Sequence, residues 1–252
     1  MTLEAISDKL IKGGSLTNEE KAWLKNYDPK RGSGQGLLYE YFTPDYVCDL
    51  MYRLAVHHGY DEQGSVLEPA AGIGRFLEVI PERIHNKVTA FEINPHLYHA
   101  AKALYPEAKW YNQYFETAFL QPPRFTTTLK DSATWLPDAP YDLVIGNPPY
   151  GKRQNRYSFY FKTENWNGKK VNVKGAFPQL ETFFIYKCLR LLKEGGLLVF
   201  ITASGFLRNG GVYDKSKEVI GEMAELVDAY RMPKVFGSTD VPTDVIILRK
   251  KY

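Results

Sequence analysis

Cysteine is scarce in this 252-residue chain, in which only Cys48 and Cys188 occur. Neither belongs to a CxxC pair, and the five histidines are scattered along the sequence. The sequence therefore predicts neither a disulfide framework nor a structural zinc site, and no metal is expected. Both thiols are predicted to lie in the core.

Long apolar runs are missing as well. The longest, Leu197 to Ala203, is far shorter than the ~20 residues that cross a bilayer. Acidic residues lie within Met1–Leu10, where a secretory signal needs an apolar segment. We therefore expect a cytoplasmic protein without a membrane-spanning segment. The 44% hydrophobic and 24% charged residues are ordinary for a packed globular chain and exclude global disorder.

The excess of charge of one sign is also small, because the formal net charge at pH 7 is only +3. Residues 151–174, however, hold seven lysines and arginines against one acid, with five aromatic residues among them. A positive groove with stacking faces is typical of proteins that bind single-stranded nucleic acid. This segment predicts nucleic-acid contacts, with a solvated mobile loop as the alternative. The candidate contact residues are Lys152, Arg153, Arg156, Tyr157, Tyr160, Lys169 and Lys170.

Short apolar runs alternate with helical stretches from residue 65 onward. Strands are predicted at Ser65–Glu68, Lys87–Glu92, Ala108–Tyr111, Tyr141–Gly146 and Gly196–Thr202. Helices are predicted at Ile73–Ile80, Pro95–Leu104 and Pro178–Lys193. This alternation predicts an α/β fold with a mostly parallel sheet. Two further strands, Glu225–Arg231 and Thr243–Arg249, are joined by a link too short for a crossover helix, which predicts one antiparallel edge strand.

The first 36 residues are predicted to form a helical extension and a glycine-rich connector, followed by a catalytic domain over residues 37–252. Thr17 with Glu20 forms a capping-box pattern that predicts a helix start. Thr43 before Pro44 predicts a second start, with a helix from about Pro44 to His58.

A small-residue segment, Glu68 to Phe76, follows the first predicted strand and lets the backbone approach a ligand. A tight turn without a ligand is the alternative. Glu92 ends the next strand about twenty residues later, where an acid can bind a ribose. The segment lacks a GxGxxG phosphate cradle, and Glu68 would repel a pyrophosphate but suit a cationic amino-acid group. The pattern therefore favours S-adenosylmethionine over NAD.

An Asn-Pro-Pro-Tyr sequence follows the predicted strand Tyr141–Gly146. Pro148 and Pro149 fix the backbone and leave carbonyls free to accept hydrogen bonds. The Asn147 oxygen and the Pro148 carbonyl could hold one amino group on a planar ring or amide and orient it toward a methyl sulfonium. Tyr150 could stack on the planar substrate. The alternative is a proline-rich turn without a chemical role.

These motifs resemble those of S-adenosylmethionine-dependent amino-methyltransferases, most closely the adenine-N6 DNA methyltransferases. The resemblance implies a Rossmann-like methyltransferase fold with a seven-stranded sheet and helices on both faces. It also implies catalytic roles for Asn147, Pro148, Pro149 and Tyr150. The cofactor residues that it implies are Tyr41, Thr43, Pro44, Glu68, Pro69, Ala70, Gly72, Gly74, Glu92, Ile93 and Phe115.

One departure from the family pattern follows the third strand, where an Asp-Phe pair usually binds the cofactor adenine. Phe115 matches the Phe, but Tyr114 stands where the acid would be. Asn112, Glu116 or a backbone group remain open as readers of the adenine.

The same motif chemistry serves amino groups of DNA, RNA and protein glutamine, so DNA is implied by the resemblance and by the positive segment. An inactive DNA-binding subunit is a third alternative, which the intact Asn147–Tyr150 motif disfavours. In the branch of the family that this chain resembles, an aromatic-Thr-Pro element, matched here by Tyr41 to Pro44, precedes the glycine motif. Restriction-associated adenine methylases with this motif order usually carry a separate recognition domain after the catalytic one. We therefore expect weak sequence specificity, a partner specificity subunit, or a longer parent protein.

Overall fold

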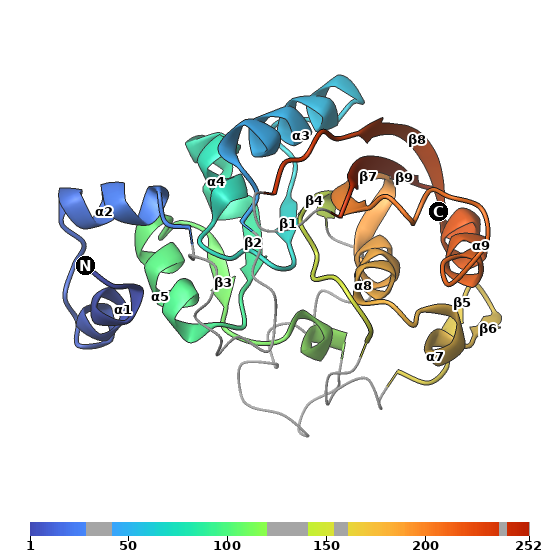
Figure 1. The fold of residues 1–252 in the computed structure, drawn as a ribbon, viewed down its shortest axis with the longest axis horizontal. Coiled ribbons are helices and arrows are strands. Elements are labelled where there is room, and N and C mark those ends of the chain that lie inside the picture. The colour runs from blue at the N-terminus through green and yellow to red at the C-terminus, as the bar shows by residue number, and fades with distance from the viewer. Residues whose placement is uncertain (29–41, 120–140, 154–160, 237–240, 252) are drawn as a thin grey trace.

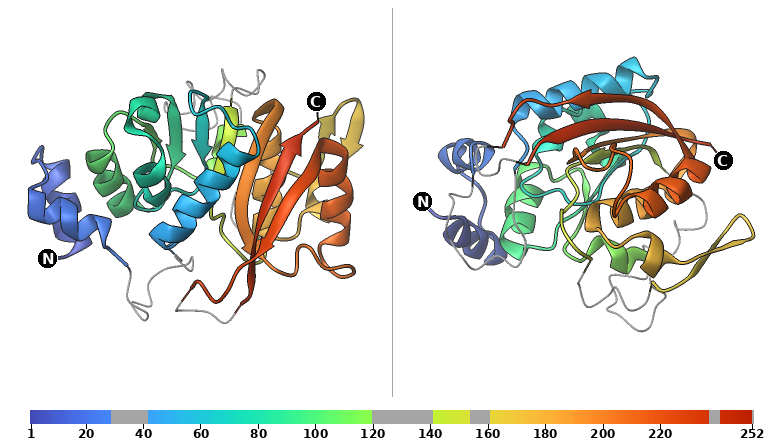
Figure 2. Two further views of the ribbon diagram at one scale, coloured as in Figure 1. Left: turned by 90° about the horizontal axis from the view of Figure 1, so that it is seen from above. Right: turned by 45° about the vertical axis from the view of Figure 1, so that its right-hand side comes forward.

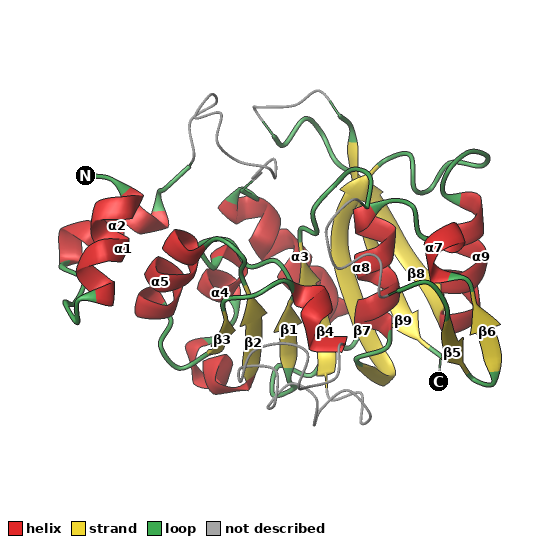
Figure 3. Ribbon diagram, turned by 90° about the horizontal axis from the view of Figure 1, so that it is seen from below, coloured by secondary structure: helices red, strands yellow, loops and turns green. Residues whose placement is uncertain are grey.

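The computed structural model describes residues 1–28, 42–119, 141–153, 161–236 and 241–251. A seven-stranded sheet in the order β3-β2-β1-β4-β7-β9-β8 forms its centre (Figure 3). The strands are β1 (Val66–Glu68), β2 (Val88–Phe91), β3 (Lys109–Tyr111), β4 (Tyr141–Gly146), β7 (Leu192–Ala203), β8 (Ala224–Arg231) and β9 (Thr243–Lys250).

The strand order reverses at β1, which pairs in parallel with β2 on one side and β4 on the other. The chain reaches β2 and β3 through α4 (Arg75–Val79), the 3-10 helix η1 (Glu82–Lys87) and α5 (Pro95–Leu104). Ligands of open α/β sheets bind at such a reversal, outside the carboxyl ends of the strands. The sheet thus determines where a site is expected.

β9 runs antiparallel to both of its neighbours, β7 and β8. It is the single antiparallel strand of this sheet over the described residues, and it lies one position in from the edge strand β8. The fold class predicted from the sequence is confirmed: the sheet has seven strands, is mostly parallel, and has its antiparallel pairing at one end.

Helices cover both faces of the sheet (Figure 2). Successive residues of the central strands point to opposite faces, and both sets are apolar. Leu143 and Val199 pack in one core with α3 (Asp45–His57) and α4. Val144 and Leu198 pack in the other with α8 (Leu180–Leu189) and α9 (Asp214–Met223). A strand buried on both faces is typical of a parallel α/β sheet.

The N-terminal residues form α1 (Leu3–Ile11) and α2 (Asn18–Lys25), which lie at the β3 end of the molecule (Figure 1). The predicted capping box is confirmed, since Thr17 and Glu20 exchange hydrogen bonds between side chain and backbone. Leu3, Ile6 and Leu24 share a core with Ile73 and Leu97, which lie in the region after residue 42. The extension therefore packs on the domain that follows it, and the predicted connector lies outside the described residues.

Three details differ from the sequence prediction. Helix α8 ends at Leu189 and not near Lys193, because buried Leu192 already pairs with Tyr141 as the first residue of β7. Pro44, not Thr43, is the N-cap of α3. Helix α9 was missed.

The segment after Tyr150, predicted to be irregular, contains regular structure within its described part. It forms a hairpin of β5 (Glu164–Trp166) and β6 (Lys169–Val171) and the short helix α7 (Val173–Ala176). The hairpin lies at the opposite end of the molecule from α1 and α2 (Figure 1). Lys250 lies over the Trp166 ring at 4.1 Å, which anchors the hairpin to the end of β9.

Candidate active site

A cavity of about 600 Å³ opens at the carboxyl ends of β1, β2 and β4, where the strand order reverses. Most of the residues predicted from the two sequence motifs line it. These are Thr43, Glu68, Pro69, Ala70, Gly72, Glu92, Ile93, Phe115, Asn147, Pro148, Pro149 and Tyr150. The fold therefore brings the glycine motif and the Asn-Pro-Pro-Tyr motif to one cavity, as the sequence predicted.

The glycine segment has the backbone conformations that require glycine. Gly72 has φ +57°, and a Cβ there would lie 3.0 Å from the Phe42 ring. Gly74 has φ +86°, and its Cβ would lie 2.8 Å from the Tyr105 ring. Gly74 precedes α4 and is not part of the cavity lining given by the described residues, so its role is to shape the turn.

Glu92 is buried directly after β2 and holds the glycine segment in place. Its Oε2 accepts a hydrogen bond from the Gly72 N–H at 2.7 Å, and its Oε1 accepts from the Asn94 N–H at 2.7 Å. The Asn112 amide donates to the carbonyls of Glu92 and Ile93 at 2.8 and 3.2 Å. Asn112 is thus engaged in supporting this turn.

Glu68 is wholly buried at the end of β1 and lines the cavity. Burial, and then the neighbouring charge of Glu92, raise the pKa of its carboxyl well above the ordinary value. Its Oε2 has no hydrogen-bond partner among the described residues. Two carboxyl groups so close together in a buried place would be stabilised by a cationic ligand.

The Asn-Pro-Pro-Tyr motif leaves β4 and is tied to the neighbouring strand. The Tyr150 hydroxyl lies 2.7 Å from Asn147 Oδ1, to which it donates, and 3.0 Å from the Ile201 carbonyl of β7. A proline-rich turn alone would need no such contact. The hydroxyl therefore holds Tyr150 and the amide of Asn147 in a defined relation at the cavity wall.

The wall opposite the glycine segment is aromatic and acidic. Phe115 begins the 3-10 helix η2 (Phe115–Phe119) and packs against Phe91 and Phe184, each with ring centroids 5.3 Å apart. Glu116 is buried beside it, and burial raises the pKa of its carboxyl to about 7. Gln113 also lines the cavity, and its Nε2 has no partner among the described residues.

Sequence reasoning did not assign several residues of the cavity wall: Arg75, Gln113, Leu180 and Phe184. Phe184 shows why such residues escape a sequence analysis. It lies in the predicted helix Pro178–Lys193, where its helical spacing predicts a core residue. It is indeed buried, yet it also lines the cavity. An apolar periodicity gives the same signal for both positions.

Comparison with known proteins identifies the family. Residues 81–236, more than half of the chain, match the Eco57I restriction-modification methylase family. The chain belongs to this family.

The curated relatives of this chain are longer proteins. It is 26% identical over 246 residues to the defense against restriction protein B of Escherichia phage P1, covering 96% of this chain but 10% of that protein. It is 30% identical over 203 residues to the type II methyltransferase M.TthHB8I of Thermus thermophilus, covering 74% of this chain and 40% of that enzyme. The chain thus spans less than half the length of either relative.

The chain has the fold of class I S-adenosylmethionine-dependent methyltransferases. A crystal structure from Listeria monocytogenes assigned to that class superposes with a TM-score of 0.66 at 18% identity. The superposition covers 99% of this chain and 81% of the other. Within the described residues, none of the helices is both long and apolar enough to cross a membrane.

The predicted nucleic-acid contact residues that the structure describes are dispersed. Lys152 is exposed and lines the cavity, whereas Arg153 lies over the Phe183 ring at 4.7 Å. Lys169 and Lys170 lie on the hairpin, where Lys169 pairs with Glu222 at 3.1 Å. Arg153 would have to leave Phe183 to reach a phosphate.

Three predicted nucleic-acid residues, Arg156, Tyr157 and Tyr160, lie outside the described residues, as does the predicted cofactor residue Tyr41. Pro44 is the N-cap of α3 and does not appear among the described lining residues. These assignments stay predictions.

Proposed function

We propose that this chain is the catalytic part of a methyltransferase that transfers a methyl group from S-adenosylmethionine to the N6 amino group of adenine in DNA. The observation that carries the proposal is that Asn147–Tyr150 lines the same cavity as Glu68 and Glu92. One end of the cavity suits a cationic cofactor, and the other suits an amino group on a planar ring.

The cofactor end fits S-adenosylmethionine by charge. Its ammonium and sulfonium groups are cationic, and Glu68 offers a buried carboxyl with an unpartnered oxygen among the described residues. Glu92 follows β2, where an acid can accept hydrogen bonds from ribose hydroxyls. When bound, the cofactor supplies an electrophilic methyl group on sulfur.

The acceptor end would act by positioning. Asn147 Oδ1 and the Pro148 carbonyl would accept the two hydrogens of the amino group and direct its nitrogen toward the methyl group. Fixed acceptors of this kind stabilise the positive charge that develops on the attacking nitrogen. The Tyr150 ring would stack on the base once it has left the duplex. The proton released from the nitrogen passes to water.

DNA is proposed as the polymer because the family is one of restriction-modification methylases. The positive segment after Tyr150, of which Lys152 lines the cavity, supports binding to a nucleic acid. Because the chain spans only part of its relatives, we propose that recognition of a target sequence is weak here or is supplied by a partner subunit or a further region.

Transfer of a tritiated methyl group tests the proposal directly. DNA, RNA and protein substrates are incubated side by side with the wild-type chain and with Asn147→Ala as the inactive control. Label is expected in DNA, at N6 of adenine after digestion to nucleosides. Label in RNA or in glutamine would overturn the choice of polymer, and binding of DNA without transfer would favour an inactive subunit.

A further inference from the structure

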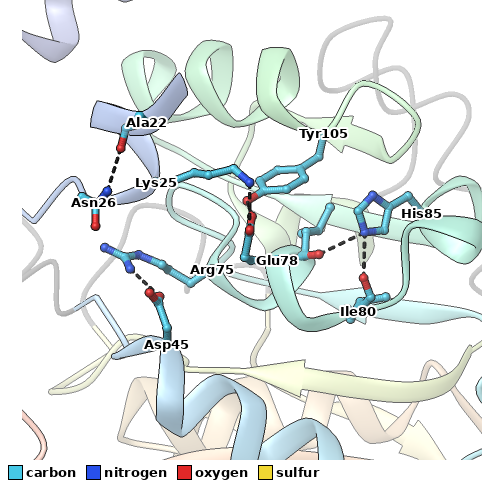
Figure 4. A network of polar contacts seen from close by, with 10 residues as sticks. Ala22, Lys25, Asn26, Asp45, Arg75, Glu78, Ile80, His85 and Tyr105 are labelled. Atoms are coloured by element: carbon cyan, nitrogen blue, oxygen red, sulfur yellow. Dashed lines mark hydrogen bonds and ion pairs between the residues drawn. The ribbon is translucent and has the colours of Figure 1, made fainter. Parts of the chain in front are cut away.

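Arg75 lies at the first position of α4 and lines the cavity beside the glycine segment. Its side chain is only 15% exposed. Nη1 donates to the Asp45 carboxylate of α3, and Nη2 donates to the Tyr27 carbonyl at 2.9 Å. Figure 4 shows the guanidinium between the end of α2 and the start of α3. Arg75 thus joins three elements at the cavity wall.

The guanidinium is not saturated by these contacts. Arginine has five N–H donors, and the ones used here belong to Nη1 and Nη2. Nε is buried and has no partner among the described residues. A buried donor without a partner is unfavourable, so a nearby acceptor would be bound strongly. A carboxylate suits this donor set because it can accept two parallel hydrogen bonds from the guanidinium fork.

Glu68 offers the opposite charge on the same cavity. The thiol of Cys48 in α3 reports on both side chains: burial first, then the charges of Glu68 and Asp45, raise its pKa, while the charge of Arg75 lowers it. Glu68 and Arg75 both line the cavity, and each presents a buried polar atom without a partner among the described residues, Oε2 of Glu68 and Nε of Arg75. An α-amino acid carries an ammonium and a carboxylate on one carbon, and an acid and a base on one cavity have the charges to bind these two groups.

We propose that Arg75 binds the α-carboxylate of the amino-acid end of the cofactor while Glu68 binds its ammonium, so that the pair selects a zwitterionic ligand. The inference rests on the proposed function, because it assumes that S-adenosylmethionine or its product binds in this cavity. Nothing in the sequence motifs distinguishes Arg75 from an ordinary helix residue.

Two product analogues test the assignment by calorimetry. S-adenosylhomocysteine carries both charges, and its decarboxylated form, 5′-S-(3-aminopropyl)-5′-thioadenosine, lacks only the carboxylate. The wild-type chain is expected to bind the complete product at least ~10-fold more tightly, as for a charge-assisted hydrogen bond. In Arg75→Ala this preference is expected to vanish, because affinity for the complete product falls while affinity for the decarboxylated form stays.

Matched variants distinguish a role of Arg75 in ligand binding from a role in holding α2 and α3 in place. Asp45→Asn removes the ion pair but keeps the guanidinium, so the preference for the complete product should remain. Lys25→Ala removes another tie of α2, the bond to Glu78 at 2.8 Å, and should also leave the preference intact. Glu68→Gln should weaken both ligands alike, since both carry the ammonium. Arg75→Lys should restore part of the preference.

Equal weakening of both ligands in Arg75→Ala would overturn the assignment and show that Arg75 only braces α2 and α3. Failure of the wild-type chain to bind either ligand would instead contradict the proposed function. The two failures are therefore distinguishable in one series of titrations.

Discussion

The cavity wall built by β1, β2 and α4 is held by hydrogen bonds to backbone N–H groups, whereas the wall built by η2 and by the segment after β4 depends on contacts of individual side chains. On the first wall, Glu92 accepts from two backbone N–H groups, and Gly72 and Gly74 adopt left-handed conformations. On the second, Tyr150 contacts Asn147, and Glu116 lies buried near Lys187. The first wall is therefore shaped by the backbone of the glycine segment, while the second can be altered one side chain at a time.

The sharpest test of the second wall is Asn147→Ala. Loss of a fixed polar group at a reacting centre should lower turnover by at least ~10²-fold. Affinity for S-adenosylhomocysteine should be nearly unchanged, because the first wall is untouched. Steady-state methylation and calorimetry measure the two quantities. Near-normal turnover in this variant would contradict the proposal that Asn147 orients the amino group for methyl transfer.

The first wall can be tested with a pair of glycines of similar backbone. Gly74 has φ +86° and faces the Tyr105 ring, while Gly13 has φ +84° with nothing within 4 Å of its Cβ position. Gly13→Ala should cost about 1 kcal/mol from backbone strain alone. Gly74→Ala should cost about 1–3 kcal/mol more because the ring must move. Urea denaturation of both variants gives the difference, and equal costs would show that the ring adapts freely.

Glu116 gives the second wall a pH dependence of its own, beside that of Glu68 on the first wall, whose pKa is also raised by burial. Burial raises the folded pKa of Glu116 to about 7 from 4.5, against the opposing charges of Lys187 and Arg153. The folded state therefore holds this proton more tightly than the unfolded state. The stability that protonated Glu116 gives the folded state is fully present below the unfolded pKa of 4.5. It is lost as the pH rises from there toward 7, by up to ~1.4 kcal/mol per pH unit. Denaturation across this range should show a shallower slope in Glu116→Gln, and an identical slope would contradict the assignment.

The smallest expected effect separates the two groups of lysines. Lys152 lines the cavity, while Lys169 lies on the β5–β6 hairpin and pairs with Glu222 of α9. Lys152→Ala should lower the dependence of single-stranded DNA affinity on salt by about 0.7, the value for one phosphate contact. Lys169→Ala serves as the control and should leave the slope unchanged. An equal effect of both would extend the DNA surface to the hairpin.

Much of this architecture could be predicted from the sequence. The alternation of strands and helices and the two motifs placed Glu68, Glu92 and Asn147 at neighbouring strand ends, because motif spacing is a local property. The end of α8 was misplaced because Leu191 and Leu192 are buried in either a helix or a strand. Hydrophobic periodicity does not decide between them.

The missing parts of the site are those that depend on long-range contacts. Arg75 gains its importance from Asp45 and the Tyr27 carbonyl, which lie 30 and 48 positions away in the chain. Gln113 and Phe184 reach one cavity from different elements, and neither has a motif of its own. Such partnerships appear only once the chain has folded.

The position of β9 has a consequence for how the protein is made. This strand, the last along the sequence, lies between β7 and β8 and pairs with both. During synthesis, β7 and β8 therefore cannot complete their pairing until β9, which leaves the ribosome after them, is available. Because Tyr150 is hydrogen-bonded to Ile201 of β7, we expect the Asn147–Tyr150 motif to reach its final geometry only after β9 has been synthesised. In a nascent chain stalled before residue 243, this motif should be less well ordered even though both sequence motifs had already been synthesised.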